Sequence, residues 1–147
     1  MAKIVAVDTD FEDNYLEETM AREAGIEFEV THGRTAQAVI DGLLETGADA
    51  AVTSYAMFPR EVFEACSNLK VVSRTGVGYD EIDVEAATEH GVAVCNVPGY
   101  GTEVVSDHAI TLALSVLRRI NELDADMRRG VWDYARTRPL GQCRGRV

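Results

Sequence analysis

The stretch LKVVSRTGVGYD, residues 69–80, opens the segment 69–119 around which the rest of the chain can be organised. Residues 70–73 predict a buried strand that carries Arg74 and the glycine turn 76–78 at its carboxyl end, where ligands bind in open α/β sheets. Two glycines around one apolar residue let successive backbone N–H groups point outward together, as in an anion-binding nest. With the guanidinium of Arg74, this turn is predicted to bind a carboxylate. Because short glycine motifs are weak signals, simple chain reversal is the alternative for the turn alone.

Strand-like and helix-like segments alternate on both sides of this turn up to residue 96. Short apolar runs predict strands, and apolar residues at three- and four-residue spacing predict helices. Strands are expected at 3–7, 26–30, 50–53, 70–73 and 92–95, and helices at 11–24, 35–44, 60–65 and 84–89. Such alternation predicts parallel βαβ units with right-handed crossovers. The expected fold is α/β, a flavodoxin-like doubly wound parallel sheet of five strands in the order 2-1-3-4-5.

The alternation stops after Asn96, where the loop PGYG (98–101) leads into a long helix expected over 102–129. A helix of this length needs an apolar partner, because most of its stability comes from packing one face. Domains are therefore expected at 1–99 and 100–147. The end of the chain, RGRV (144–147), resembles the entry to a further strand, so the sequence is expected to stop just inside its second domain.

Composition restricts the classes of partner. The 147 residues carry a formal charge of −11, with 24 acidic and 8 basic residues in 1–127 against 1 and 6 in 128–147. An acidic body argues against nucleic acid, which requires a basic surface. No apolar run approaches the ~20 residues of a membrane span, and no secretory signal opens the chain. Three widely spaced cysteines fit reduced thiols in the cytoplasm and give no metal-binding spacing.

Four motifs occur in order: RTGVGYDEID (74–83), GVAVCNVP (91–98), GYGTEVVSDHA (99–109) and GVWDY (130–134). Together they resemble the D-isomer-specific 2-hydroxyacid dehydrogenases. The last two motifs are similar to those of the C-terminal-binding-protein-like branch of that family. The resemblance covers nearly the whole chain and is strongest over 69–134.

The resemblance implies an NAD-dependent oxidoreductase, with NADP as the alternative cofactor, that transfers hydride between nicotinamide and a small 2-hydroxy or 2-oxo acid. It implies a substrate-binding lid domain over 1–99 and a truncated Rossmann domain from 100 onward. It also implies a homodimer formed through the 102–129 helix. The Gly-x-Gly-x-x-Gly fingerprint and the catalytic Arg, Glu and His of the family do not occur in these 147 residues. No catalytic residue is therefore assigned, and the chain by itself is expected to be inactive.

By resemblance, the loop with Arg74, Gly76, Val77 and Gly78 contacts the substrate carboxylate, and Val77 also approaches the cofactor. No metal ligand is implied. The three histidines are not substitutes for the missing catalytic one, because they lie in a turn, at a helix end and on the long helix.

Three further residues have a functional interpretation and a structural alternative. Tyr55 belongs to the loop SYAM (54–57), which matches the lid loop that shapes the substrate pocket; the alternative is a partly buried aromatic side chain. Asn96 matches a polar residue facing the cleft, or it caps the turn before Pro98. Thr102 meets the nicotinamide end of the cofactor, or it is a plain helix N-cap.

Two other classes of protein are alternatives. A phosphoacceptor receiver domain shares the five-unit fold, and Asp8 and Asp10 imitate its paired acids. That class requires an aspartate at the end of the third strand, where this chain has Thr53 and Ser54. A corepressor-like or small-carboxylate-binding module without catalysis is the second alternative.

Overall fold

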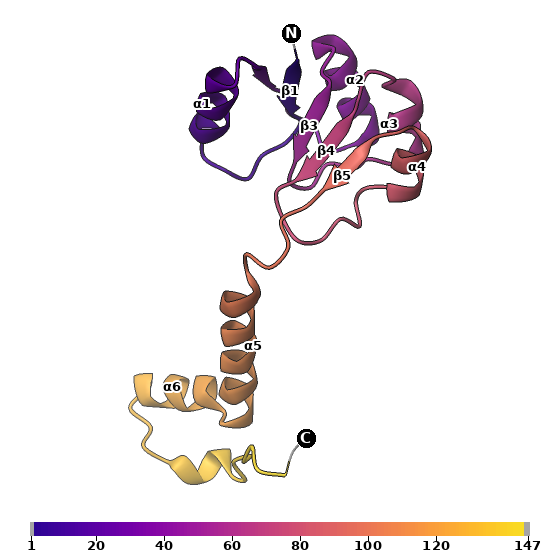
Figure 1. Cartoon of the computed structure of the whole chain (residues 1–147). Helices are drawn as coiled ribbons and strands as arrows, with labels where there is room; N and C mark the ends of the chain where they lie inside the picture. The colour runs from indigo at the N-terminus through magenta and orange to yellow at the C-terminus, as the bar shows by residue number, and fades with distance from the viewer. Residues whose placement is uncertain (1, 146–147) are drawn as a thin grey trace. The chain divides into compact units, whose positions relative to one another are not determined.

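A computed structural model describes residues 2–145, and the chain divides into two compact units, Met1–Gly99 and Tyr100–Val147 (Figure 1). A five-stranded sheet forms the centre of the first unit. Its strands are β1 (Lys3–Ala6), β2 (Glu27–Val30), β3 (Ala50–Thr53), β4 (Val71–Arg74) and β5 (Ala93–Cys95). The strand order is β2-β1-β3-β4-β5 and every pair is parallel, which confirms the predicted doubly wound sheet.

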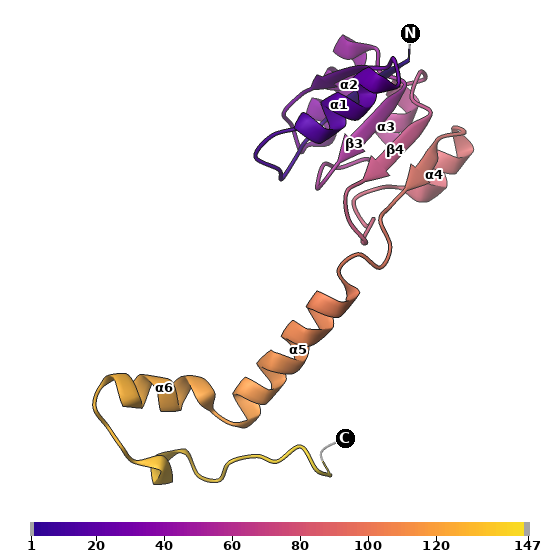
Figure 2. The ribbon, with the colours of Figure 1, turned by 60° about the vertical axis from the view of Figure 1, so that its left-hand side comes forward.

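Four helices connect these strands: α1 (Tyr15–Glu23), α2 (Ala36–Thr46), α3 (Arg60–Ala65) and α4 (Val84–Glu89). The strand order reverses direction at β1, and right-handed crossovers therefore place α1 on one face of the sheet and the other three helices on the opposite face. Figures 1 and 2 show this division. The same reversal brings the loops after β1 and β3 next to each other, since these strands are neighbours.

The core lies between the sheet and α2, α3 and α4. Its members are apolar side chains with at most 6% of their surface exposed, including Val5, Val39, Phe58, Val62, Phe63, Val72 and Ala86. The rings of Phe58 and Phe63 lie 6.3 Å apart in a tilted arrangement. Each fully buried side chain of this size contributes about 1.5–3 kcal/mol, so this layer holds the strand ends in place.

Helix α1 begins later than its sequence pattern predicts. Residues 11 and 12 form bends, residues 13 and 14 have no regular structure, and the helix starts at Tyr15, whose backbone N–H donates to the carboxylate of Asp13. Such a local side-chain acceptor favours a turn over a helix. Only Ala21 is buried on α1, while Leu16 and Met20 are 65% and 61% exposed. The apolar spacing that predicted a buried stripe therefore does not describe a packed face in this structure.

The second unit contains α5 (Thr102–Leu117), α6 (Ile120–Arg128) and the 3-10 helix η1 (Tyr134–Thr137). One continuous helix over 102–129 was predicted, and this is wrong. The chain breaks at Arg119, whose backbone adopts the left-handed conformation with φ 53°. The carbonyl of Leu117 accepts a hydrogen bond from Gly141, and the carbonyl of Thr137 accepts one from the Arg119 guanidinium. A returning segment thus supplies partners that a straight helix would not meet.

No helix in residues 2–145 is both long and apolar enough to cross a membrane. The predicted strand entry at 144–147 falls partly on residues outside those described: Gly145 is in a turn, and residues 146 and 147 are not described.

Candidate functional site

Buried polar side chains gather at the carboxyl ends of β1 and β3. Asp8, Thr53 and Ser54 expose 5%, 1% and 3% of their surfaces. A buried carboxylate is costly unless its charge is hydrogen-bonded or paired. Burial of these polar groups at the carboxyl edge of the sheet therefore costs free energy, which their hydrogen bonds and ion pairs must offset.

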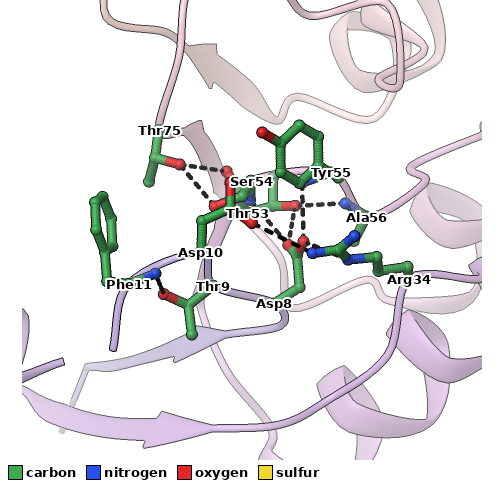
Figure 3. A network of polar contacts seen from close by, with 10 residues as sticks. All are labelled: Asp8, Thr9, Asp10, Phe11, Arg34, Thr53, Ser54, Tyr55, Ala56 and Thr75. Atoms are coloured by element: carbon green, nitrogen blue, oxygen red, sulfur yellow. Dashed lines mark hydrogen bonds and ion pairs between the residues drawn. The ribbon is translucent and has the colours of Figure 1, made fainter. Parts of the chain in front are cut away.

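Asp8 is the centre of this network (Figure 3). Its Oδ1 accepts hydrogen bonds from the hydroxyl of Thr53 at 2.7 Å and the backbone N–H of Ser54 at 2.8 Å. Its Oδ2 accepts one from the backbone N–H of Tyr55 at 2.9 Å and lies 3.4 Å from Nε of Arg34. The loop after β3 is thus bound directly to the end of β1.

The end of β4 joins the same network. The hydroxyls of Ser54 and Thr75 are hydrogen-bonded at 2.9 Å, and the N–H of Thr75 donates to the carbonyl of Thr53 at 2.9 Å. Figure 3 shows Thr75 approaching Ser54 from β4. Three loops that are far apart in sequence are therefore fixed to one another beside Arg74.

The Tyr55 ring lies close to two arginines. The guanidinium carbons of Arg34 and Arg74 are 5.0 and 5.5 Å from the centre of its ring, within the range of cation–π contacts. The Asp10 carboxylate, through hydrogen bonding and then through its charge, raises the pKa of the Tyr55 hydroxyl. The Tyr55 side chain is 45% exposed, so part of its surface faces solvent.

Arg74 is the last residue of β4 and is half-buried. Its Nε is buried without a hydrogen-bond partner in the described part of the chain, and no acidic group there lies within ion-pair distance. Arg34, in contrast, pairs with Asp8 and Asp10. A half-buried cation with an unused donor is a site to which an anion can bind.

The glycine turn lies directly beside Arg74. Neither Gly76 nor Gly78 has a positive φ, so the turn does not use either glycine for a left-handed conformation. A Cβ at Gly76 would instead overlap Nη1 of Arg74, the far end of a flexible side chain. No residue from 2 to 145 accepts a hydrogen bond from the N–H groups of Gly76, Val77 or Gly78. These groups remain available to an acceptor on a ligand.

Asn96 reaches the same turn from the end of β5. Its Nδ2 donates to the carbonyl of Val77 at 2.8 Å, and the N–H of Val97 donates to the carbonyl of Gly76 at 3.0 Å. The described contact is thus to the turn at 76–78 rather than a cap before Pro98. The first unit brings together Tyr55, Arg74, Asn96 and the glycine turn.

Thr102 belongs to the other unit and is the first residue of α5. The cap position is occupied by Gly101, so the plain N-cap interpretation of Thr102 is wrong.

His90 caps α4 and its Nδ1 lies 2.8 Å from the carbonyl of Ala86, which agrees with its expected place at a helix end.

Sequence reasoning missed Asp8, Arg34, Thr53 and Thr75 as parts of this site. The sequence suggested a role for Asp8 only as a counterpart of the paired acids of receiver domains. The available signal was its position: polar residues follow two strands, β1 and β3, that the predicted order places side by side.

Other candidate sites are less suited to ligand chemistry. A cavity of about 500 Å³ in the second unit is lined by three arginines, but Arg129 and Arg136 pair with the buried Asp126 and Arg119 pairs with Glu122. Among residues 2–145, no three His, Cys, Asp or Glu side chains converge as they would around a metal ion. The carboxyl edge of the sheet is the better supported site.

The fold is an α/β doubly wound parallel sheet, and an unpaired cation and unused amides lie at its carboxyl edge, where ligands bind in such sheets. The comparison with protein families is more specific. The D-isomer specific 2-hydroxyacid dehydrogenase catalytic domain matches residues 4–138, and the chain belongs to this family.

Individual relatives agree. A D-3-phosphoglycerate dehydrogenase of Archaeoglobus fulgidus is 38% identical over 112 residues, which are 76% of this chain and 21% of that protein. A glyoxylate reductase of Korarchaeum cryptofilum is 45% identical over 75 residues, 51% of this chain and 23% of that protein. The NAD-bound formate dehydrogenase of Staphylococcus aureus superimposes with a TM-score of 0.73 at 28% identity, over 91% of this chain and 44% of that chain. This chain thus spans less than half the length of each of them.

Proposed function

We propose that this chain supplies the substrate-binding part of an NAD(P)-dependent dehydrogenase acting on D-2-hydroxy acids. In this proposal residues 1–99 are the lid domain, and residues 100–147 belong to the nucleotide-binding domain. The motifs at 99–109 and 130–134 support a place in the C-terminal-binding-protein-like branch. The relatives named above, together with an imino acid reductase solved with NADPH and D-Arg, support a nicotinamide cofactor.

One observation carries the proposal. Arg74 has a buried donor without a partner beside three backbone N–H groups that no described residue uses. A carboxylate has two oxygens and about four acceptor positions, which suit a guanidinium and neighbouring amides. Arg74 and the turn 76–78 would bind and orient the carboxylate of a 2-hydroxy or 2-oxo acid, and Tyr55 would lie against it from the loop after β3.

The nicotinamide, when bound, supplies the acceptor or donor of hydride. Val77 is 47% exposed and offers an apolar contact to a planar ring, which fits the cofactor contact expected of it. Thr102 remains a proposed contact from the second unit. The roles proposed for the residues of this chain are to bind and orient the substrate.

Titration of the 147-residue chain with oxalate, followed by amide NMR shifts, tests the carboxylate site. The largest shifts are expected at Gly76, Val77 and Gly78. Arg74→Gln should weaken binding at least about tenfold, because hydrogen bonds to charged groups contribute about 1.5–3 kcal/mol. Arg22→Gln removes an equal charge on the exposed helix α1 and should leave binding unchanged. Shifts confined to other residues, or equal effects of both variants, would contradict the proposal.

Turnover is tested with the polypeptide encoded by the complete reading frame that contains this sequence. NADH and NADPH oxidation should be followed with glyoxylate, hydroxypyruvate and 3-phosphohydroxypyruvate, which the names of the relatives suggest. We expect turnover with at least one acid, and none from the 147-residue chain alone. Carboxylate binding without turnover in the complete polypeptide would favour the small-carboxylate-binding alternative.

We further propose that the chain forms a homodimer through residues 102–129. Helix α5 has no buried residue, and its apolar side chains Val104, Val105, Ile110, Leu112, Leu114 and Val116 are 43–76% exposed. Apolar surface exposed on this scale normally marks an interaction site. Sedimentation should show a concentration-dependent dimer that Val105→Glu with Leu112→Glu abolishes and Gln37→Glu, at an exposed position of α2, does not. A monomer at every concentration would contradict the dimer.

A cytoplasmic location completes the proposal. It is supported by three free cysteines, of which Cys95 and Cys143 are exposed. Exposed thiols persist in reducing compartments.

A further inference from the structure

Asp8 makes more hydrogen bonds and ion pairs than are needed to fix the end of β1. An ionised carboxylate offers about four acceptor positions. The side chain of Asp8 has four partners: the Thr53 hydroxyl, two backbone N–H groups and the Arg34 guanidinium. Both carboxylate oxygens are therefore occupied by partners within the protein. Asp8 differs in this respect from the metal-binding aspartate of receiver domains, which it resembles in sequence position.

The contacts of Asp8 are directed at one loop. The four successive N–H groups of residues 54–57 all have acceptors at the edge of the sheet. Those of Ser54 and Tyr55 donate to Asp8, that of Ala56 to the hydroxyl of Thr53 at 3.0 Å, and that of Met57 to the carbonyl of Arg34 at 3.0 Å. The hydroxyl of Thr53 itself donates to Asp8, so Asp8 fixes the Thr53 side chain that receives the third bond.

This arrangement determines where Tyr55 lies. With its backbone held by Asp8, the Tyr55 ring is placed close to Arg34 and Arg74, and Ser54 is placed against Thr75. Figure 3 shows Asp8 below the loop and Tyr55 extending away from it. Loops at the edges of sheets are ordinarily among the least stable segments of a domain. Here the hydrogen bonds of four successive backbone amides restrict the motion of the loop.

We infer that Asp8 is a positioning residue, which holds the loop 54–57 in the conformation that presents Tyr55 to a carboxylate bound at Arg74. The inference deepens the proposed function and rests on it for the identity of the bound carboxylate. Asp8 touches neither substrate nor cofactor; it acts through the backbone of Ser54 and Tyr55. Substitution should therefore loosen this loop and weaken carboxylate binding without disturbing the rest of the sheet.

The test compares Asp8→Asn with Asp49→Asn in the 147-residue chain. Asp49 is a matched control, because it also accepts a backbone N–H, from Lys3 at 3.1 Å, and pairs with Lys70, but at the amino end of β3. Both variants remove one negative charge and replace one accepting carboxylate oxygen by an amide NH2 group. Amide hydrogen exchange of residues 54–57 and the dissociation constant of oxalate are measured in each, with the melting temperature as a measure of folding.

Asp8→Asn is expected to accelerate exchange at Ser54 and Tyr55 at least about tenfold and to weaken oxalate binding at least about fivefold, consistent with the loss of hydrogen bonds to a charged acceptor. Asp49→Asn should do neither. If Asp8→Asn fails to fold, Thr53→Val removes one donor to Asp8 and the acceptor of Ala56, and Thr53→Ser, which keeps the hydroxyl, should restore slow exchange.

Unchanged exchange at Ser54 and Tyr55 in a folded Asp8→Asn variant would overturn the inference. Faster exchange with unchanged oxalate binding would also overturn it, because the loop would then be irrelevant to the site. If the unsubstituted chain does not bind oxalate, the proposed function fails and the substrate role of Asp8 fails with it. The exchange measurement would still show in that case whether Asp8 anchors the loop.

Discussion

The guanidinium of Arg74 occupies the space over Gly76 that a side chain at residue 76 would need. A Cβ there would overlap Nη1, the far end of the arginine, rather than any backbone atom. Gly78, in the same turn, has nothing closer than 3.8 Å to such a Cβ, and neither glycine has a positive φ. A Cβ at residue 76 would therefore displace the Arg74 side chain, whereas a Cβ at residue 78 would make no close contact.

Gly76→Ala is expected to displace the Arg74 side chain while leaving the fold intact, because the clash falls on a flexible group. Oxalate binding should fall at least about tenfold, the loss expected when a charged hydrogen-bond donor leaves its site. Gly78→Ala is the matched control and should bind oxalate like the unsubstituted chain. Equal binding by both variants, measured by amide NMR titration, would show that the position of Arg74 does not matter.

Asn96→Ala should loosen the turn 76–78, because its Nδ2 is the side-chain donor to the carbonyl of Val77. An exposed neutral hydrogen bond contributes about 1 kcal/mol, so oxalate binding should weaken by about fivefold. Asn68→Ala changes an exposed asparagine of the same unit outside this contact and serves as the control. A wild-type dissociation constant for Asn96→Ala would leave Asn96 without a role in the site.

The Tyr55 hydroxyl should keep its proton at a pH where a free tyrosine ionises, because Asp10 raises its pKa above the ordinary value of about 10. A folded-state pKa that is raised stabilises the fold below the unfolded pKa, and this contribution is lost as the pH rises through the folded value. Asp10→Asn should shift the titration of the Tyr55 ring carbon, followed by NMR, to lower pH. Tyr55→Phe identifies the signal, and an unshifted titration would exclude Asp10 as the cause.

A comparison of Arg119→Gly with Arg119→Ala should distinguish the cost of the left-handed backbone conformation from the loss of side-chain hydrogen bonds at the break between α5 and α6. Both lose the hydrogen bonds of the guanidinium to Glu122 and Thr137, but only glycine adopts φ 53° without cost. Arg119→Ala should therefore be less stable than Arg119→Gly by about 1 kcal/mol. Urea unfolding followed at amides of α6 measures the difference, and equal stabilities would mean that the helix runs straight in solution.

The sequence alone determined the sheet and the loops from which the site is built. Short apolar runs and helix-terminating glycines such as Gly47 and Gly91 report local conformation and burial, and right-handed crossovers then leave few strand orders. The helix α2, for example, was predicted at 35–44 and is found at 36–46. The position of Arg74 and the turn 76–78 at a carboxyl edge followed from the same reasoning.

The tertiary structure decided the contacts. Asp8 meets its partners in Thr53, Ser54 and Tyr55 across 45 to 47 residues of sequence, and the residue that breaks the long helix is fixed by a carbonyl 18 residues away. Hydrophobic periodicity shows which residues face a core, but it has no term for a hydrogen bond between distant loops. The overlap that a Cβ at residue 76 would make with Arg74 likewise depends on where the arginine side chain lies, which only the packed structure determines.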